Sequence, residues 1–345
     1  MKPTRGLLRP AFSLVELLAV SAIIGMLIAL VVPAMQRVRA AAANTQCVNN
    51  MKQLGLGLQQ YHDVFRHFPS GNWTGAYEER LLADGRLAAY WTGQVGGPWS
   101  YDILPYIGLE SLWKLRPPNS LTLGIPKFRH EQEDDGVRSA EYLDAWKAGA
   151  PIVVCPAAPR PQRGSYGDTY PITSYVGVQG RLGPPTWERM TRFFEEDGVF
   201  PQVSWDLPYY QPWVRLTDIT DGASNTLMVG ERGAIGTWQG GGWSELLYAI
   251  WSDEPLTGRG CAGYRFSPGD DFLTNGCHFY HFWSFHSGGG NWLLCDGSVR
   301  FMQYSAGTTV IPLMATIAGG EDIPPLDGDA LLVGRHRSAT ALRLC

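Results

Sequence analysis

The segment from residue 12 to residue 35, FSLVELLAVSAIIGMLIALVVPAM, is apolar apart from two serines and Glu16. Its last 19 residues carry no charge, which is enough α-helix to cross most of a hydrocarbon layer about 30 Å thick. Three basic residues precede the segment: Lys2, Arg5 and Arg9. Because positive charge stays on the cytoplasmic side, the sequence predicts a single-pass protein of the inner (cytoplasmic) membrane. We expect a cytoplasmic N-terminus, with the rest of the chain periplasmic or at the cell surface.

Glu16 separates two interpretations of this segment. A carboxylate inside an inserting helix costs about 2.5–3.5 kcal/mol, so Glu16 is expected to have a role. A secretory signal has a shorter apolar core followed by a small-residue cleavage site, and a plain signal anchor with a chance glutamate is the alternative. The run that begins Ala11-Phe12-Ser13-Leu14-Val15-Glu16 resembles the N-terminus of type IV pilins and type II secretion pseudopilins.

This resemblance implies roles for three residues. A prepilin peptidase would cut between Ala11 and Phe12, and the new amino group of Phe12 would be methylated. Glu16, then the fifth mature residue, would pair with the N-terminal amine of a neighbouring subunit during assembly. Ala11 departs from the family pattern, which usually has Gly before the cut. The expected partners are the inner membrane, the prepilin peptidase, and other pilin-like subunits or a secretion apparatus.

Composition narrows the class of the remaining chain. Among 345 residues, 41 are Gly and 24 are Pro, while only 17% are charged. This mixture favours a loop-rich, strand-rich extracytoplasmic domain over a helical one. The net charge of −4, with no long basic run, argues against nucleic acid as a partner.

The six cysteines show no zinc-finger spacing, which makes a zinc ribbon a poor explanation. In an oxidising compartment they are expected to form disulfides. Six cysteines allow many pairings, of which we favour two: Cys47 with Cys155, and Cys261 with Cys277. The first would tie the stem helix to the head, and the second would close a short Gly-rich loop. The two others, Cys295 and Cys345, are left as a third pair or as free thiols.

An apolar stripe extends the helix beyond the membrane segment. Its members follow alternating spacings of four and three residues: Cys47, Met51, Leu54, Leu58, Tyr61 and Phe65. Gly55 and Gly57 lie within it and each costs up to ~1 kcal/mol of helix propensity, so packing on a head must hold this stretch helical. Phe68 and Pro69 end the helix.

The predicted fold class is α+β and pilin-like, with one long N-terminal helix packed on a loop-rich, mainly antiparallel β head. Five parts follow from these boundaries: a leader (1–11), a transmembrane and assembly helix (12–35), its amphipathic continuation (36–68), a β-rich head (69–321) and a C-terminal tail (322–345). Predicted strands cover 152–155, 172–178, 226–230 and 243–251. Predicted short helices cover 81–83, 110–113 and 139–147.

A hairpin is expected near the C-terminal end of the head. Two apolar runs flank Asp296-Gly297, a dipeptide that favours a two-residue type I′ turn. This register would place Leu294 opposite Val299 and Trp292 opposite Phe301, with all four side chains on the core face.

Four segments together resemble one large family of prepilin-type proteins: 47–69, 217–231, 284–299 and 314–321. Members carry a C-terminal signature of His, nine residues and Asp-Gly, which falls here on His286, Asp296 and Gly297. The family is especially abundant in planctomycete-type bacteria, and its domain carries a label meaning unknown function. The resemblance covers nearly the whole chain. It implies a pilin-like envelope protein without supplying an activity.

The signature histidine has two interpretations. In the first, the imidazole anchors the Gly-rich loop that follows it, by bonding backbone or Asp296. In the second, three histidines and two upstream aspartates bind a metal such as zinc: His278, His281, His286, Asp270 and Asp271. Their spacing matches no standard motif, so we favour the first.

Other patterns suggest binding rather than catalysis. Asp218, Asp221 and their neighbours are rich in calcium-type oxygen ligands, but a turn explains them as well, because EF-hand spacing is missing. Six tryptophans beside Gly, Pro or polar residues are candidates for sugar stacking, with core packing as the alternative: Trp99, Trp187, Trp205, Trp213, Trp238 and Trp243. No catalytic motif of the nucleophile-elbow, zinc-protease or phosphate-loop kind occurs.

We therefore expect a non-enzymatic, pilin-like, membrane-anchored envelope or surface-appendage subunit without a required cofactor. An anchored glycan- or solute-binding module is the alternative. A metal-dependent surface enzyme, with calcium or zinc as cofactor, is the third interpretation.

Overall fold

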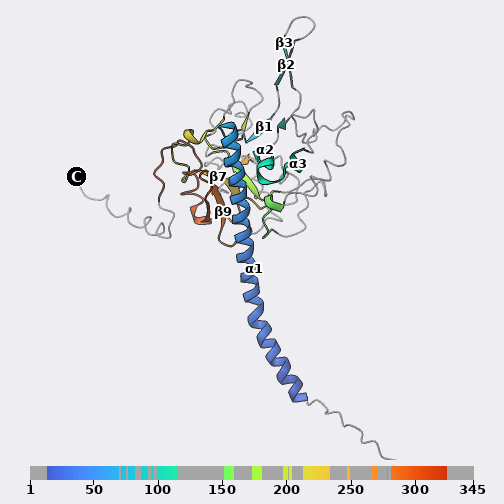
Figure 1. The fold of residues 1–345 in the computed structure, drawn as a ribbon. Coiled ribbons are helices and arrows are strands. Elements are labelled where there is room, and N and C mark those ends of the chain that lie inside the picture. The colour runs from blue at the N-terminus through green and yellow to red at the C-terminus, as the bar shows by residue number, and fades with distance from the viewer. Residues whose placement is uncertain are drawn as a thin grey trace, which may run out of the picture.

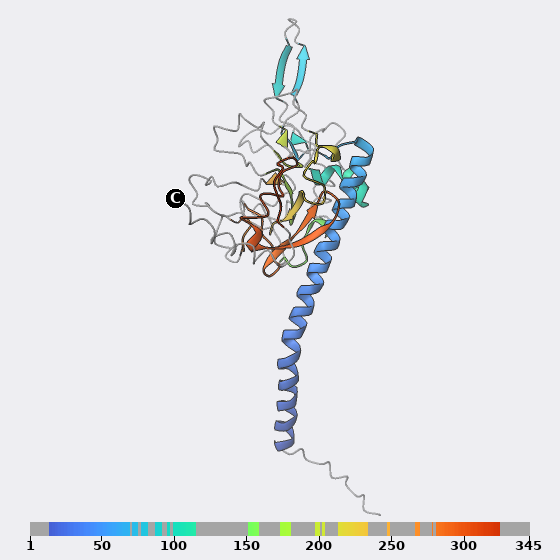
Figure 2. The ribbon, with the colours of Figure 1, turned by 90° about the vertical axis from the view of Figure 1, so that its left-hand side faces the viewer.

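The computed structural model describes residues 14–69, 71–74, 77–81, 87–91, 95–96, 99–114, 151–158, 173–180, 197–200, 202–203, 213–233, 247–248, 266–269, 278 and 281–324. A single helix, α1 (Leu14–Phe65), runs beneath and along a head built around one small sheet (Figure 1). Its 52 residues continue through Pro33 and span about 80 Å. The perpendicular view shows the same division into a projecting half and a docked half (Figure 2).

The docked half of α1 buries the predicted stripe. The four side chains from Cys47 to Leu58 are fully buried, Tyr61 is half-buried, and Phe65 is 48% exposed at the end of the helix. The two glycines allow the close approach. A β-carbon on Gly55 would lie 2.8 Å from Leu293 Cδ1, and one on Gly57 would lie 2.5 Å from Ile107 Cγ2. The predicted packing of this stretch against a head is thus confirmed.

The central sheet has five strands in the order β10-β9-β7-β5-β8. Their bounds are β5 (Tyr175–Val178), β7 (Leu227–Glu231), β8 (Leu247–Tyr248), β9 (Gly289–Leu294) and β10 (Val299–Gln303). Every neighbouring pair is antiparallel except β5 with β8. The predicted α+β class with a mainly antiparallel head is confirmed.

The sheet is covered on both faces, so its middle strands are buried throughout. Alternate side chains enter two apolar clusters. Leu293 and Val229 pack with α1, whereas Trp292 and Leu294 pack with Met314 on the opposite face. The strands therefore read as continuous apolar runs rather than as an alternating pattern.

Smaller elements surround this centre. Strands β1 (Asn72–Thr74), β4 (Val95–Gly96) and β6 (Gln202–Val203) form a second sheet, and β2 (Tyr77–Leu81) pairs with β3 (Leu87–Trp91). Among the described residues, the short helices are α2 (Trp99–Asp102), η1 (Leu104–Ile107), α3 (Glu110–Lys114), η2 (Pro151–Val153), η5 (Leu216–Asp218) and η7 (Tyr304–Ala306).

The hairpin forms where expected but in a different register. Val299 pairs with Leu293 and Phe301 with Asn291, one residue away from the prediction. The loop has three residues, with Gly297 at φ +82°, and a turn closed by the Gly297 N–H bond to Leu294 O (2.9 Å). A type I turn followed by a left-handed glycine replaces the type I′ turn. Because a one-residue slip exchanges the two faces, Phe301 is 44% exposed rather than buried.

Some of the other predicted strands and helices are confirmed and some are wrong. The predicted strands at 172–178 and 226–230 contain β5 and most of β7, β8 lies within 243–251, and the predicted helix at 110–113 lies in α3. The predicted strand at 152–155 is wrong, because residues from Pro151 form a 3₁₀ turn whose Val153 carbonyl accepts from Ser174 N–H (2.7 Å). The predicted helix at 81–83 begins inside strand β2. Residues 139–147 lie outside the described residues.

Candidate functional site

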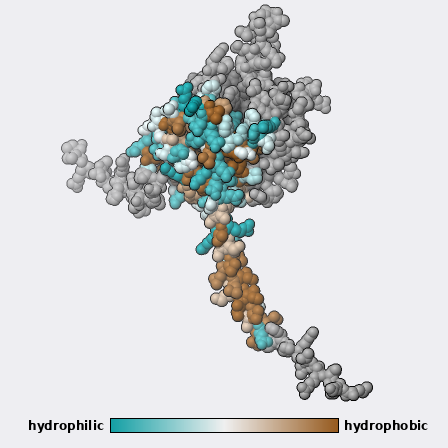
Figure 3. All heavy atoms as spheres, in the orientation of Figure 1, coloured by the Kyte–Doolittle hydropathy of each residue, from teal (hydrophilic) through white to brown (hydrophobic). Residues whose placement is uncertain are grey.

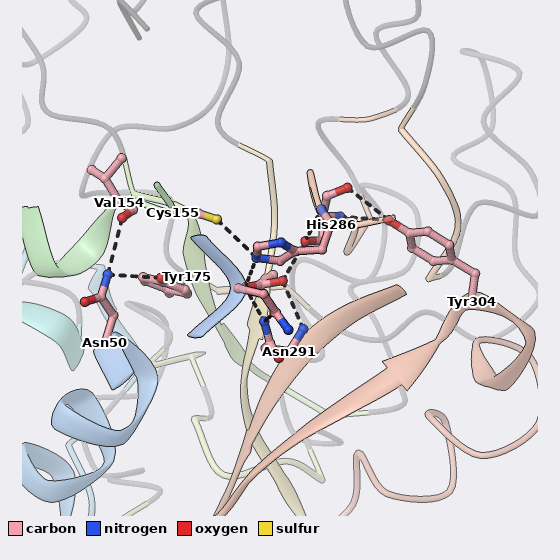
Figure 4. A network of polar contacts seen from close by, with 10 residues as sticks. Asn50, Val154, Cys155, Tyr175, His286, Asn291 and Tyr304 are labelled. Atoms are coloured by element: carbon pink, nitrogen blue, oxygen red, sulfur yellow. Dashed lines mark hydrogen bonds and ion pairs between the residues drawn. The ribbon is translucent and has the colours of Figure 1, made fainter. Parts of the chain in front are cut away.

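Four metal-ligating side chains meet where α1 docks on the head: Cys47, Cys155, Glu231 and His286. Their sulfur, carboxylate and imidazole donor atoms all lie within 4.8 Å of one another. Each comes from a different segment: α1, the turn after η2, the end of β7 and the loop before β9. All four are buried. We call this group the junction cluster, and Figure 4 shows much of its surrounding network.

His286 lies between the sulfur and carboxylate groups. Its Nε2 is 3.4 Å from Cys155 Sγ and 3.4 Å from Glu231 Oε1. Burial lowers the pKa of His286, but contacts with Cys47 and the Glu231 carboxylate outweigh it and raise the pKa to about 9. The His286 backbone N–H also donates to Ser284 Oγ (3.1 Å), which fixes the loop that carries the ring.

Glu231 is held by donors on both of its carboxylate oxygens. Oε2 accepts from Ser284 Oγ (2.6 Å) and from the Asn291 backbone N–H (2.9 Å), and Oε1 accepts from Asn291 Nδ2 (3.0 Å). Burial alone raises the pKa of this carboxyl, but His286, Ser284 and the Asn291 amide reverse the effect and hold the pKa below its usual value. Asn291 Nδ2 also donates to Asn44 Oδ1 on α1 (2.8 Å).

The two cysteines of the junction cluster are free thiols. Cys47 and Cys155 lie close together, as the predicted pairing requires, but the expected disulfide between them is not formed. The sulfurs instead share contacts with the His286 ring. The Cys155 contact and burial raise the pKa of Cys47 well above its ordinary value, so the Cys47 thiol is neutral in this arrangement. The second predicted pair, Cys261 with Cys277, lies outside the described residues, as does Cys345, whereas Cys295 is a buried free thiol.

A second polar link joins the same helix to the head. Asn50 Nδ2 on α1 donates to Tyr175 Oη (3.3 Å) and to Val154 O (3.4 Å), as Figure 4 shows. Burial, with the nearby Cys47 thiol, raises the pKa of Tyr175. On the other side, Tyr304 Oη donates to Ser284 O (3.0 Å). The junction cluster is therefore continuous with a network that reaches α1, the residue after η2, β5 and the start of η7.

The signature residues do not contact one another. His286 enters the junction cluster, whereas Asp296 Oδ1 accepts from Ser298 N–H (2.8 Å) and fixes the hairpin turn. Between them runs β9, whose six residues span about 20 Å. The two signature residues therefore have separate roles on either side of β9: His286 belongs to the junction cluster, and Asp296 fixes the hairpin turn.

A comparison with protein families assigns most of the chain to one family. Residues 36–308 match the family described as "Protein of unknown function (DUF1559)". The chain belongs to this family. No curated protein and no solved structure matches the chain.

The DUF1559 region starts at the residue after the predicted membrane segment and includes the whole junction cluster. It confirms the domain family inferred from the four sequence segments. Three cluster residues were singled out from the sequence, in separate roles, but Glu231 was not. The available signal was a carboxylate that ends an otherwise apolar strand, LMVGE. Such a group is expected to be buried with partners.

The other histidines of the predicted metal set make a separate contact. His278 Nδ1 lies 2.7 Å from His281 Nε2, and His281 Nδ1 lies 2.9 Å from Phe282 O. Both rings are buried. Among the described residues, the group of possible metal ligands includes His286 but neither of these two. Asp270 and Asp271 lie outside the described residues.

The aspartates in residues 217–231 accept hydrogen bonds mainly from backbone N–H groups. Asp221 accepts from Gly319 N–H (2.7 Å) and Gly320 N–H (2.9 Å), and from Thr316 Oγ1 (3.1 Å). Asp218 Oδ2 accepts from Arg215 N–H (2.8 Å) at the start of η5. The turn interpretation accounts for these oxygens. The bonds of Asp221 also connect two of the four segments that carried the family resemblance, 217–231 and 314–321.

The candidate sugar-stacking residues do not form one surface in the described part of the chain. Trp99 is buried in the core, which fits the core-packing alternative and removes it as a sugar-stacking candidate. Trp213 is 42% exposed, and its ring stacks on His67 with centroids 4.4 Å apart. The four others, Trp187, Trp205, Trp238 and Trp243, lie outside the described residues.

Proposed function

We propose that this protein is a pilin-like, membrane-anchored subunit of the cell envelope or of a surface appendage, without enzymatic activity. The observation that carries the proposal is the division of α1. From Leu14 to Val38 its large apolar side chains are exposed, and its most apolar stretch buries nothing against the head. Figure 3 shows this projecting half as predominantly hydrophobic. The same helix then becomes part of the head core at Cys47.

An uninterrupted helix of this kind supports assembly as well as anchoring. About 20 apolar residues of helix are enough to cross the hydrocarbon core of a bilayer. Because the same helix continues without a break into the head, it also fixes the orientation of the head relative to the membrane segment. Glu16 lies in the first turn of α1. The predicted leader junction at Ala11 and Phe12 lies outside the described residues. Its cleavage, methylation and pairing with Glu16 are parts of the proposal.

Mass spectrometry of the mature N-terminus tests the proposed processing. The full chain is produced in bacteria with and without a prepilin peptidase, and the membrane fraction is extracted. We expect an N-methylated Phe12 terminus only where the peptidase is present. An intact Met1 in both strains would contradict processing, and a cut beyond residue 35 would contradict the anchor as well.

A matched pair of helix variants tests assembly. Glu16→Gln is expected to abolish co-purification with filaments or secretion machinery while leaving the protein in the membrane. Ser21→Ala is the control, because the Ser21 hydroxyl donates only to Leu18 O within the same helix (2.9 Å). Equal recovery of both variants with the assembly would contradict a role for Glu16.

A further inference from the structure

The junction cluster has the ligand set of a structural zinc site. Zinc in such sites takes four protein ligands drawn from thiolate, imidazole and carboxylate. Two sulfurs, one ring nitrogen and one carboxylate oxygen converge here from four segments of the chain. We propose that Cys47, Cys155, Glu231 and His286 bind one zinc ion, which fastens the membrane-proximal helix to the head.

The separations between the donor atoms of the junction cluster fit a tetrahedral zinc ion. With Zn–S near 2.3 Å and Zn–N or Zn–O near 2.0–2.1 Å, neighbouring ligand atoms are about 3.3–3.8 Å apart. His286 Nε2 lies 3.4 Å from both Cys155 Sγ and Glu231 Oε1. No pair in the junction cluster exceeds 4.8 Å, so small side-chain rotations complete the tetrahedron.

The surroundings are also those of a metal site. Ligating carboxylates in proteins are themselves hydrogen-bonded, which orients them toward the ion. Ser284 Oγ and the Asn291 backbone N–H both donate to Glu231 Oε2, at 2.6 Å and 2.9 Å. Oε1 lies 3.4 Å from His286 Nε2 and would be the coordinating atom, while Asn291 Nδ2 also donates to it (3.0 Å). Asn291 then connects this second layer to Asn44 on α1 (2.8 Å).

The ligand types favour zinc over hard cations. Calcium and magnesium require oxygen ligands, whereas thiolates select zinc and other soft ions. Coordination by two thiolates and a neutral imidazole releases the protons of both thiols and the second ring proton of His286. Two thiolates and one carboxylate then face a doubly charged ion, which gives a net charge of −1 at a site with hydrogen-bond donors around the carboxylate.

Burial assigns the ion a structural role. Catalytic zinc keeps a position for water or substrate, but here four protein ligands fill the tetrahedron and all four side chains are buried. The ligands come from α1, the turn after η2, the end of β7 and the loop before β9. Zinc would therefore cross-link the parts of the head to which α1 docks, and its binding would be coupled to folding.

Metal content and cobalt substitution test this site directly. The full chain is purified in detergent, under reducing conditions and without a metal-affinity step. We expect about one zinc per chain by elemental analysis. Replacement by Co²⁺ is expected to give thiolate-to-cobalt charge-transfer bands together with the visible bands of tetrahedral Co²⁺.

Single variants identify the ligands. Cys47→Ser and Cys155→Ser are each expected to reduce the charge-transfer intensity to roughly half, since one of two thiolates remains. His286→Ala and Glu231→Gln are expected to keep the charge-transfer bands but weaken metal affinity by about 10-fold or more. Cys295→Ala is the matched control. It removes another buried free thiol, outside the junction cluster, and is expected to leave metal content and both sets of bands unchanged.

Two results would overturn the proposal. One is wild-type protein that carries no zinc and gives no thiolate–cobalt bands when Co²⁺ is added. The other is peptide mapping under non-reducing conditions that finds Cys47 and Cys155 joined by a disulfide in the metal-containing protein. Both results are obtained with the wild-type protein and do not depend on the folding of a variant. Both are also separate from the proposed assembly role, which concerns Phe12 and Glu16.

Discussion

At the scale of single residues, Gly57 lies where α1 crosses η1. A β-carbon there would lie 2.5 Å from Ile107 Cγ2, a methyl on a branched carbon with little freedom to move. We expect Gly57→Ala to lower the free energy of unfolding by about 1–2 kcal/mol, because overpacking outweighs the gain in helix propensity. Denaturant unfolding in detergent measures it. Gly55→Ala is the control, since it meets the flexible end of Leu293, and an equal loss in both variants would contradict this explanation.

His62 couples the end of α1 to pH. Its Nε2 accepts a hydrogen bond from Leu216 N–H (3.1 Å), which only the neutral ring can do. Burial is the main cause that lowers the pKa of His62, although Asp63 acts in the opposite direction. The pKa of His62 is lower in the folded protein than in the unfolded chain, where it is about 6.5. The contact therefore stabilises the fold fully above about pH 6.5, and this stabilisation is lost as the pH falls from there through the folded-state pKa.

The pH dependence of unfolding tests this contact. We expect the thermal midpoint of the wild type to fall more steeply between pH 7 and pH 5 than that of His62→Gln, whose amide oxygen accepts without titrating. Identical slopes for the two proteins would remove His62 as the cause.

At the scale of elements, Asp221 fastens the segment after the second apolar cluster to the turn before β7. Its carboxylate accepts from two consecutive backbone amides, Gly319 and Gly320. We expect Asp221→Ala to cost about 1.5–3 kcal/mol, since both bonds are to a charged acceptor. Hydrogen exchange at these two amides should accelerate, whereas Asp218→Ala should leave it unchanged because Asp218 bonds Arg215 N–H. If added calcium slowed exchange at these two amides in the wild type, the interpretation of Asp221 as a turn residue without a metal role would be contradicted.

The hairpin shows which element features sequence predicts and which it does not. Asp296-Gly297 correctly located the turn, because glycine there takes a left-handed conformation. The register depended on a loop of three residues rather than two, and the Leu294 N–H bond to Ser298 O (2.9 Å) sets it. A one-residue change was enough to bring Phe301 to the surface and Met302 into the core. Apolar alternation could not exclude it, since β9 is buried on both faces.

At the scale of the whole molecule, the projecting half of α1 contributes no packing to the head. Deleting residues 1–38 is expected to move the protein from the membrane fraction to the soluble fraction. The unfolding free energy should change by no more than about 0.5 kcal/mol, because the described side chains of this stretch, residues 14–38, are exposed rather than packed on the head. Deleting residues 1–50 is the control, since it also removes Cys47 and Asn44 and should destabilise the head strongly. Equal stability of the two truncated proteins would contradict the role of the docked half.

The sequence by itself determined the linear features of this protein. An uncharged apolar length, a stripe at helical spacing and a turn dipeptide are local patterns, and they predicted α1, its docking face and the β9–β10 hairpin. The tertiary structure decided which distant side chains meet. Cys47, Cys155, Glu231 and His286 are scattered along the chain, and no spacing relates them. Only the docking of α1 across the sheet brings a helix residue, a turn residue, a strand-end residue and a loop residue within 4.8 Å, because burial of apolar faces fixes where these polar groups lie.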